Sequence, residues 1–413
     1  MGIIIERPLL RRFLESQGRR LLYGRRKTGK TFYTRHVLRD YTYFIVRPGG
    51  AIYDPVEDEE LSTGAFLRLC RTGDRIILDE FHRAERRLFD ALQAGVCTEN
   101  LVFITSTLHY HRSLLEPPGA PLKGLFAERR VGLLSPVELL AHPWPEPSDW
   151  RSFIELLVLY QEPTLIGRSL VDIVAGGREL ARSLVGEVLT EEDRAYTARY
   201  DAILEAIAAG HERAGEIASY LHARGLLEKP STGSVMKYLI DMTRMGLLEA
   251  LEVWGKKRRR VYRHASPLTD LVYYLDARYG FYDLPLPELR AVKAAEQRLP
   301  LLVERFVERL LADARGLRPV RILNPEVDVA LVEYRRLRLV AEVKWIRGRL
   351  GRRELDRIEA KLLSLPAEER LLVVPEASQL VGETGLTILD ARGLAEEARR
   401  AAESWGLVQK NKG

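Results

Sequence analysis

Short apolar runs alternate with amphipathic stretches over the first 140 residues of the chain. Strand-like runs occur at 20–23, 43–46, 76–78, 101–105 and 131–134. This alternation is typical of a parallel sheet covered by helices, because the strands of such a sheet are buried on both faces. The pattern therefore predicts an α/β unit over residues 1–142.

The pattern changes after three prolines between Pro143 and Pro147. Residues 149–198 have helical periodicity throughout, and proline clusters commonly separate structural units. We therefore expect a helical lid over residues 143–199.

The second half of the chain divides again at Pro285 and Pro287. Before these prolines, three helical segments precede two short strands around a basic turn, which defines a unit over 200–284. After them, long helical stretches flank strands near 327–332 and 338–343, which predicts a second α/β unit over 285–413. The predicted fold class is thus a multidomain α/β protein.

Length and composition agree with several folded domains. The chain has 413 residues, of which 46% are hydrophobic and 30% charged, and this excludes disordered chains and disulfide miniproteins. With Cys70 and Cys97 as the two cysteines, a disulfide framework is excluded and a reducing cytoplasm is expected. No uninterrupted apolar run is long enough to anchor the chain in a membrane. The net charge of +6 permits nucleic-acid binding without requiring it.

A phosphate-binding motif follows the first apolar run. The sequence fits G-x-x-x-x-G-K-T and opens a helical segment at 32–39. Glycines let the backbone curl so that its N–H groups face a phosphate, while the lysine supplies a cation and the threonine a hydroxyl for Mg²⁺. The motif predicts binding of ATP with Mg²⁺ through Gly24, Arg25, Arg26, Lys27, Thr28, Gly29, Lys30 and Thr31.

A buried strand at 75–78 ends in the two carboxylates that such a site requires. We expect Asp79 to hold Mg²⁺ through water and Glu80 to polarise the attacking water. The alternative is an acidic strand end that makes surface ion pairs. The strand at 101–105 delivers Ser106 and Thr107, either of which is a candidate sensor of the γ-phosphate, although an ordinary strand-end turn explains these hydroxyls equally well.

These motifs and the segments after them resemble the archaeal P-loop ATPases of the STAND class, which are AAA+-like. The resemblance rests on the phosphate loop, the strand ending in Asp79 and Glu80, and the Leu-Val-Phe-Ile-Thr-Ser strand. It implies ATP hydrolysis, a winged helix and a C-terminal domain similar to PD-(D/E)xK nucleases. Two positions depart from the family pattern: its opening motif is reduced to Glu6-Arg7-Pro8-Leu9-Leu10, and its Gly-Arg is replaced by Gly124-Leu125.

The unit over 200–284 has the element order of a winged helix. Helices are expected at 201–209 and 214–224, then a third capped by Ser231, before a hairpin with a basic turn. Such a turn suits the backbone or minor groove of double-stranded DNA. A solvated hairpin tip and a docking face for another domain are the alternatives. The candidate DNA-binding residues are Lys256, Lys257, Arg258, Arg259 and Arg260.

The last unit contains an order of acids and lysine that matches the nuclease-like family. Glu304 lies on a helix, Asp328 precedes a strand, and Glu342 and Lys344 form E-x-K on the next strand. Asp328 and Glu342 would bind Mg²⁺, with Lys344 on the same face to stabilise the reacting phosphate. The alternatives are surface ion pairs on an amphipathic hairpin and an inactive nuclease fold.

Together the sequence predicts an ATP-driven switch coupled to a DNA-binding winged helix and a nuclease-like domain. The alternatives are an ATP-gated DNA-binding regulator whose last domain is inactive and an interaction hub that uses nucleotide to hold its fold. Expected partners are ATP, double-stranded DNA and, as an open question, further copies of the chain.

Overall fold

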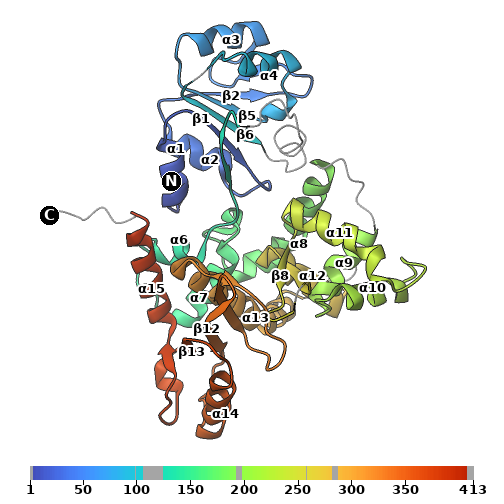
Figure 1. Cartoon of the computed structure of the whole chain (residues 1–413), viewed down its shortest axis with the longest axis vertical. Coiled ribbons are helices and arrows are strands. Elements are labelled where there is room, and N and C mark those ends of the chain that lie inside the picture. The colour runs from blue at the N-terminus through green and yellow to red at the C-terminus, as the bar shows by residue number, and fades with distance from the viewer. Residues whose placement is uncertain are drawn as a thin grey trace, which may run out of the picture.

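The computed structural model of the 413-residue chain describes residues 3–97, 99–105, 124–191, 198–256, 258–280 and 287–406. Figure 1 shows the N-terminal sheet unit at one end, the helix α14 of the C-terminal unit at the other, and the helices α9 to α11 to one side. Helices α6, α7 and α13 lie between them. Among the described residues, no helix has the length and apolarity needed to cross a membrane.

The N-terminal unit contains one seven-stranded sheet with the strand order β4-β3-β2-β5-β6-β1-β7. Strands β2, β5, β6, β1 and β7 are parallel, and β3 and β4 are antiparallel additions at one edge. The elements are α1 (Pro8–Glu15), β1 (Arg19–Tyr23), α2 (Lys30–Val37), β2 (Thr42–Val46), β3 (Ile52–Asp54), β4 (Glu59–Leu61), α3 (Thr63–Arg71), β5 (Ile76–Asp79), η1 (Phe81–Arg83), α4 (Arg86–Gln93), β6 (Leu101–Thr105) and β7 (Ala127–Arg130).

The central strands of this sheet are buried on both faces. Alternate residues of β5 go to different cores: Ile76 and Leu78 pack with α3 and α4, and Ile77 packs on the opposite face with α1 and α2. This division follows from the two-residue period of a strand, and it explains why the strands read as continuous apolar runs. The parallel α/β sheet predicted from those runs is confirmed.

The edge strand of the sheet differs from the prediction. The expected strand at 131–134 is wrong, because the strand β7 ends at Arg130 and Val131 follows it, with its backbone N–H donating to Tyr23 O at 2.8 Å. An edge strand has solvent on one side and tolerates polar residues, so Ala127–Arg130 carries no apolar run. The apolar residues after it lead into α6 instead.

The segment after β7 forms α6 (Pro136–Ala141), α7 (Trp150–Tyr160), η2 (Pro163–Leu165) and α8 (Leu170–Glu191). Helices α6 and α7 share one apolar core with α13 (Glu288–Arg315) and α15 (Ala391–Ser404). The segment predicted as a lid therefore packs on the C-terminal unit, and its residues around η2 reach the phosphate loop.

The next unit consists of α9 (Ala198–Ala208), α10 (Ala214–Ala223), α11 (Thr232–Met245), β8 (Leu248–Glu252), β9 (Arg260–His264) and α12 (Pro267–Tyr279). These elements surround one apolar core, and β8 and β9 form an antiparallel hairpin. Ser231 is the N-cap residue of α11, but its side chain makes no capping hydrogen bond, contrary to our expectation.

The C-terminal unit is a five-stranded mixed sheet with the order β10-β11-β12-β13-β14. One face packs against α14, and the other joins the core around α13 and α15. Its elements are β10 (Arg318–Pro319), β11 (Val329–Glu333), β12 (Arg336–Val343), α14 (Arg352–Leu363), β13 (Glu369–Val373), η3 (Ala377–Gln379) and β14 (Thr387–Leu389).

Candidate functional site

The phosphate loop joins β1 to α2 at the carboxyl edge of the N-terminal sheet. Gly24 has φ of +148°, and a Cβ there would lie 2.2 Å from Val131 O, so this position excludes any larger residue. Gly29 has φ of +81° and directly precedes α2. The two glycines therefore set the curl of the loop and aim it at the N-terminus of a helix.

Lys30 is folded into this loop. Its Nζ donates to Gly24 O at 2.8 Å and to Arg25 O at 2.7 Å. Burial lowers the pKa of Lys30 to about 7, against the opposing charges of Asp79 and Glu80. The ammonium group is thus placed inside the loop, where a bound phosphate would restore its full charge.

Thr31 and Asp79 come together across the sheet edge. Thr31 Oγ1 donates to Asp79 Oδ2 at 2.5 Å, and the hydroxyl of Tyr43 donates to the same oxygen at 3.1 Å. Burial raises the pKa of Asp79, against the hydrogen bond from Thr31. A hydroxyl and a carboxylate are oxygen donors of the type that Mg²⁺ prefers, so the residues fit this ion.

Glu80 follows Asp79 in a left-handed backbone conformation with φ of 53°. Its carboxylate lies 3.8 Å from Arg26, 3.4 Å from Arg83 and 3.6 Å from Nε2 of His82. The expected sensors Ser106 and Thr107 both lie outside the described residues, and their role stays a prediction. The last described residue of β6 is Thr105, which sequence reasoning passed over.

Other side chains of the phosphate loop bind parts of the chain outside the sheet. Arg25 is buried and pairs with Glu162 at 2.7 Å, and Ser266 donates to the same carboxylate. Lys27 pairs with Glu187 of α8 at 2.9 Å. These partners are far away in sequence, so no local pattern could have indicated them.

The opening residue Arg7 also holds the loop. Its guanidinium donates to Thr28 O at 3.1 Å and to Gly132 O at 3.2 Å, and it pairs with Glu138 of α6. Thr28 Oγ1 in turn donates to Arg25 O at 3.0 Å. Arg7 therefore joins the N-terminus, the loop and α6, a role that the sequence did not indicate.

A cavity of about 290 Å³ opens beside the loop between the N-terminus and η2. Its walls are mostly apolar, and Phe32, near the start of α2, is 59% exposed as a residue. The cavity is also lined by Thr28 and Gly29 of the loop. A planar apolar group attached to a phosphate would fit such a pocket. The apolar residues lining it are Ile3, Ile5, Phe32, Leu134, Pro163 and Ile166.

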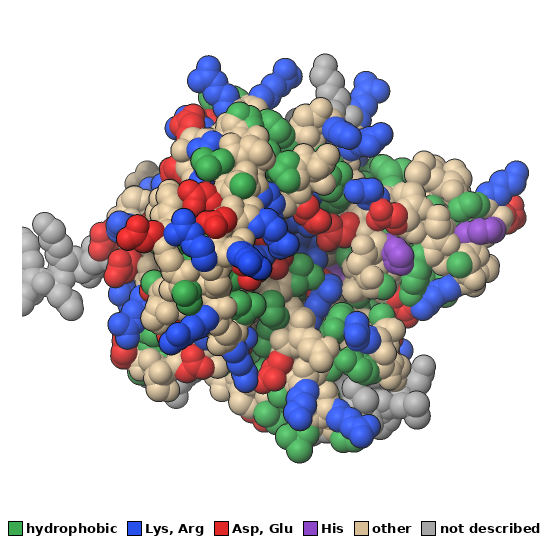
Figure 2. All heavy atoms as spheres, turned by 90° about the horizontal axis from the view of Figure 1, so that it is seen from below, with side chains coloured by type: hydrophobic (Ala, Val, Ile, Leu, Met, Phe, Trp, Pro, Cys, Tyr) green, Lys and Arg blue, Asp and Glu red, His purple; other side chains and the backbone are tan. Residues whose placement is uncertain are grey.

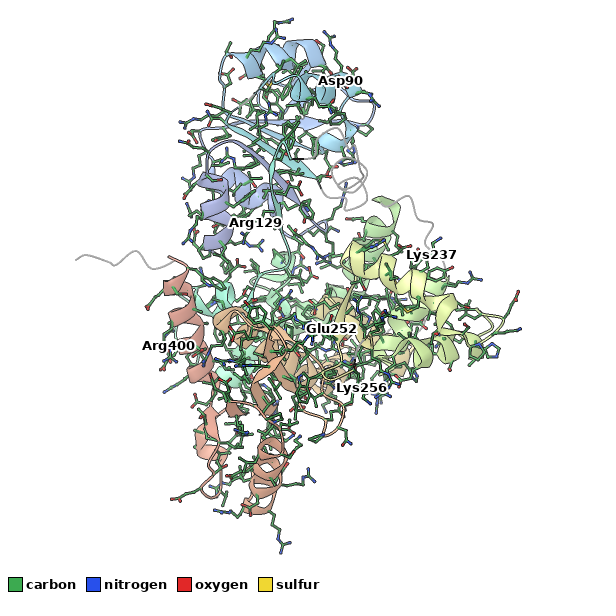
Figure 3. All side chains as sticks on the ribbon, in the orientation of Figure 1. Asp90, Arg129, Lys237, Glu252, Lys256 and Arg400 are labelled. Carbon is green, nitrogen blue, oxygen red and sulfur yellow. The ribbon has the colours of Figure 1, made fainter. Side chains whose placement is uncertain are left out.

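The basic turn between β8 and β9 is exposed at its tip and anchored at its base. The exposed cations are Lys256, Arg258, Arg259 and Arg260, while Lys257 lies outside the described residues. At the base, Trp254 N donates to Arg321 O at 2.9 Å, and Glu252 pairs with Arg318 at 2.7 Å. Figure 3 shows Glu252 and Lys256 on this hairpin. The hairpin therefore docks on the C-terminal unit through its base.

Figure 2 shows the molecule from below. Lysine and arginine side chains are spread over this face and alternate with acidic ones. The cations on this face are therefore interspersed with acids and do not form one continuous basic patch.

The acids of the C-terminal unit gather where β11 and β12 lie side by side. Asp328 Oδ2 accepts a hydrogen bond of 2.8 Å from Val343 N. Lys344 pairs with Glu342 Oε1 at 2.7 Å, as an E-x-K pair on one face of a strand allows. Lys361 of α14, which the sequence did not indicate, pairs with the second oxygen of Glu342.

Glu304 approaches these acids from α13. Burial, together with the charge of Asp328, raises the pKa of Glu304 to about 8. Both carboxylates line a small cavity of about 20 Å³ with Arg305 and Arg321. The described residues contain no group of three histidine, cysteine or acidic side chains that could hold a metal ion. With both oxygens of Glu342 engaged by ammonium groups, the expected Mg²⁺ site does not fit this arrangement.

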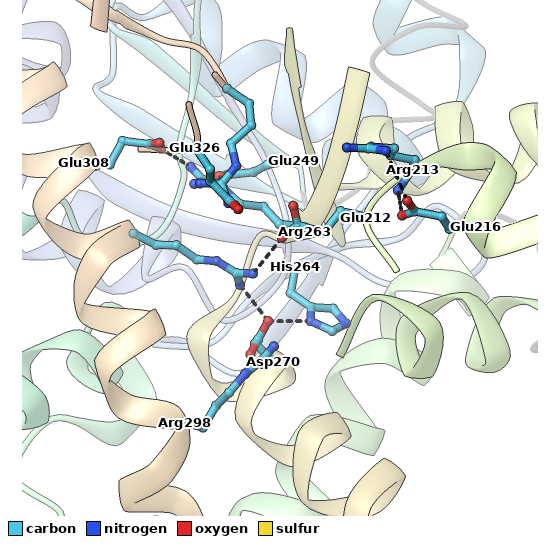
Figure 4. A network of polar contacts seen from close by, with 12 residues as sticks. Glu212, Arg213, Glu216, Glu249, Arg263, His264, Asp270, Arg298, Glu308 and Glu326 are labelled. Carbon is cyan, nitrogen blue, oxygen red and sulfur yellow. Dashed lines mark hydrogen bonds and ion pairs between the residues drawn. The ribbon is translucent and has the colours of Figure 1, made fainter. Parts of the chain in front are cut away.

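A buried ionic network connects β9, α12 and α13 (Figure 4). Asp270 accepts hydrogen bonds from Arg298 at 2.7 Å and from Arg305 at 2.6 Å, and it lies 2.9 Å from His264 Nδ1. Burial alone would raise the pKa of Asp270, but Arg305 and Arg298 hold it well below its usual range. The network fixes α13 to the hairpin and α12.

Comparisons with known proteins give similarity in structure. No family model matches the sequence, and a search of curated proteins found no match. The chain is similar to the Walker-type ATPase PABY2304 of Pyrococcus abyssi, with 20% identity and a TM-score of 0.46 over 65% of this chain and 96% of that one.

Two further solved structures are similar to a smaller degree. ORC1 of Aeropyrum pernix, solved in complex with DNA, has 17% identity and a TM-score of 0.29 over 67% of this chain and 92% of that one. The STAND protein PH0952 of Pyrococcus horikoshii, with a tetratricopeptide-repeat sensor, has 14% identity and a TM-score of 0.29 over 76% of this chain and 53% of that one. Structural similarity with TM-scores this low does not indicate a function for this chain.

Proposed function

We propose that the chain binds ATP with Mg²⁺ at the phosphate loop and hydrolyses it. The observation that carries this proposal is the convergence of Lys30, Thr31 and Asp79 at one sheet edge, where Thr31 and Asp79 meet at 2.5 Å. Thr31 and Asp79 would hold Mg²⁺, which supplies positive charge to the reacting phosphates. Glu80 follows directly and serves as the base that orients water.

The apolar cavity beside the loop supports a nucleoside triphosphate as ligand. Its exposed ring, Phe32, is two residues from Lys30, so a base in the cavity and phosphates in the loop belong to one molecule. Pro163 and Ile166 close the far wall. Contacts from both sides of the cavity would therefore tie the sheet unit to the η2 segment when nucleotide is bound.

ATP acts here as a switch between units. Arg25 of the loop binds Glu162, and Glu162 also binds Ser266, the N-cap residue of α12. One turn further on, Asp270 of α12 binds Arg298 and Arg305 of α13. A displacement of the loop is thereby coupled to the helix that carries Glu304.

The middle unit is the part of the chain that contacts DNA. Three helices followed by a two-stranded hairpin have the order of a winged helix, and the exposed turn carries Lys256 and Arg258 to Arg260. Cations at this density bind phosphates through counterion release. The C-terminal unit serves as a binding module, because Lys344 and Lys361 pair with the two carboxylate oxygens of Glu342 that the expected Mg²⁺ would need.

ATP binding and turnover test the phosphate site. Lys30→Ala should weaken ATP binding about 10- to 100-fold, the scale of one lost charged hydrogen-bond partner. Glu80→Gln should keep binding and reduce turnover about 10²-fold. Arg68→Ala, an exposed position on α3, serves as the control for charge removal in the same unit. Unchanged affinity in folded Lys30→Ala protein would remove the assignment.

DNA binding is tested by neutralising the same number of cations at two different places on the surface. Replacing Lys256, Arg258, Arg259 and Arg260 with glutamine should lower duplex affinity and flatten its salt dependence by about one log-log unit per lost contact. The matched variant replaces four exposed cations of the C-terminal unit: Arg349, Arg352, Arg353 and Arg357. Equal effects of the two variants would show that the hairpin has no special role. Mg²⁺-dependent cutting of DNA that Glu342→Ala abolishes would restore the nuclease reading.

A further inference from the structure

His82 lies between the two strand ends that border the phosphate site. It belongs to η1, the short helix after β5, and its Nδ1 lies 3.1 Å from Thr105 Oγ1. Thr105 is fully buried at the end of β6, the neighbouring parallel strand. On its other side, Nε2 of His82 lies 3.6 Å from Glu80 Oε2, slightly beyond hydrogen-bonding distance. One imidazole ring thus spans the gap from β6 to Glu80.

A neutral imidazole donates a hydrogen bond from one ring nitrogen and accepts one at the other. Burial, with the charge of Arg83, lowers the pKa of His82 to about 4, so the ring is neutral near pH 7 and carries one N–H. A carboxylate accepts but does not donate, so a bond to Glu80 requires the proton on Nε2. Nδ1 is then an acceptor, and Thr105 must donate its hydroxyl proton to it.

This constraint couples Thr105 to Glu80. When the Thr105 hydroxyl donates to His82, the Nε2 proton faces the carboxylate of Glu80. When that hydroxyl donates elsewhere, as to an anion at the strand end, Nδ1 must carry the proton to bind Thr105, and Nε2 becomes an acceptor that Glu80 cannot use. The ring therefore gives the carboxylate two states without any change of charge.

From this geometry we infer that His82 is a positioning residue for Glu80, which it orients according to the hydrogen bonding of Thr105. The inference rests on the proposed ATPase function. The arginines near Glu80 cannot replace His82 in this role: Arg26 and Arg83 approach to 3.8 and 3.4 Å, and a guanidinium has donors only, so it cannot change from donor to acceptor when Thr105 does. A neutral imidazole can make that change, because either ring nitrogen can carry its one proton.

Two substitutions separate the two ring nitrogens. His82→Asn keeps a polar group near the position of Nδ1 and loses the reach to Glu80, whereas His82→Gln keeps the reach toward Glu80. We expect His82→Asn to lower kcat for ATP about 10-fold or more with KM nearly unchanged, the usual scale for a catalytic group displaced by about 1 Å. His82→Gln should recover most of that loss. Thr105→Val should lower kcat in the same way, because it removes the hydroxyl at constant shape.

The controls distinguish this inference from the proposed function. Glu80→Gln reports on the base itself, and His222→Asn, at an exposed position on α10, reports on histidine removal elsewhere. Wild-type kcat in folded His82→Asn, together with a loss in Glu80→Gln, would overturn the role of His82 and leave the ATPase intact. Wild-type turnover in Glu80→Gln would overturn both. Equal kcat losses in His82→Asn and His82→Gln would also reject the inference, since a merely structural histidine would behave so.

Discussion

The ion pair between Arg25 and Glu162 is the most direct physical link between the phosphate loop and the rest of the chain. The side chain of Glu162 is 0% exposed and that of Arg25 is 6% exposed, and one guanidinium nitrogen lies 2.7 Å from both carboxylate oxygens. A second nitrogen of Arg25, Nη1, is buried and has no hydrogen-bond partner among the residues that the structure describes. The charge of Arg25 is therefore compensated chiefly by Glu162.

Glu162→Gln keeps the shape of this side chain and removes its charge. Removing one partner of a buried ion pair typically costs about 3–5 kcal/mol, because the other charge stays buried. The amide still accepts from Ser266 and Arg25, so we expect about 3 kcal/mol. Arg25→Met should cost a similar amount by leaving the carboxylate uncompensated. The double variant Arg25→Met with Glu162→Gln removes both charges and should cost far less than the sum.

The assay is equilibrium urea unfolding of the four proteins, with ATP affinity measured in parallel. Tryptophan emission follows the segment near Glu162, because Trp144 and Trp150 pack against the core that contains η2. We expect a coupling energy of at least about 2 kcal/mol between the two positions. If the two single variants add without coupling, the pair contributes nothing of its own and the switch path through Glu162 is refuted.

Two further outcomes follow from the geometry. Gly24→Ala should abolish ATP binding, because its Cβ would lie 2.2 Å from Val131 O. Gly132→Ala, where a Cβ meets nothing within 4 Å, should bind ATP normally. Calorimetric titration measures both affinities, and equal values would contradict the role of Gly24 in shaping the loop. The raised pKa of Glu304, about 8, means that the folded chain holds a proton that the unfolded chain loses above pH 4.5, so stability should fall by about 3.5 kcal/mol between pH 5 and 8. Glu304→Gln should remove that decline in urea unfolding, and an unchanged pH dependence would contradict it.

The arrangement of the candidate phosphate site could be predicted from sequence because each of its parts is a short local motif. Gly24 to Thr31 form one contiguous motif, and the run from Ile76 leads directly to Asp79 and Glu80. In a parallel sheet, strand ends meet at one edge, so two short motifs suffice to bring Thr31 and Asp79 into contact. The central strands were predicted for the same reason, since burial on both faces leaves an unbroken apolar run.

The remaining contacts depend on how separate units pack, and no local pattern carries that information. Arg25 and Glu162 are 137 residues apart, and Lys361 reaches Glu342 from the helix that follows the strand. The E-x-K pattern is equally satisfied by a metal ligand and by an ion pair, so the sequence could not separate the two. The edge strand β7 was misplaced because solvent exposure removes the apolar signal.

The four cations of the phosphate loop have four different sets of partners, and this distribution has a mechanical consequence. Lys30 binds carbonyls of the loop itself, whereas Arg25 binds Glu162, Arg26 approaches Glu80 and Lys27 binds Glu187 of α8. A nucleotide that draws the loop around its phosphates must strain or break some of these pairs. Because each pair ends on a different element, the same displacement reaches the carboxylate of Glu80, the η2 segment and α8 together.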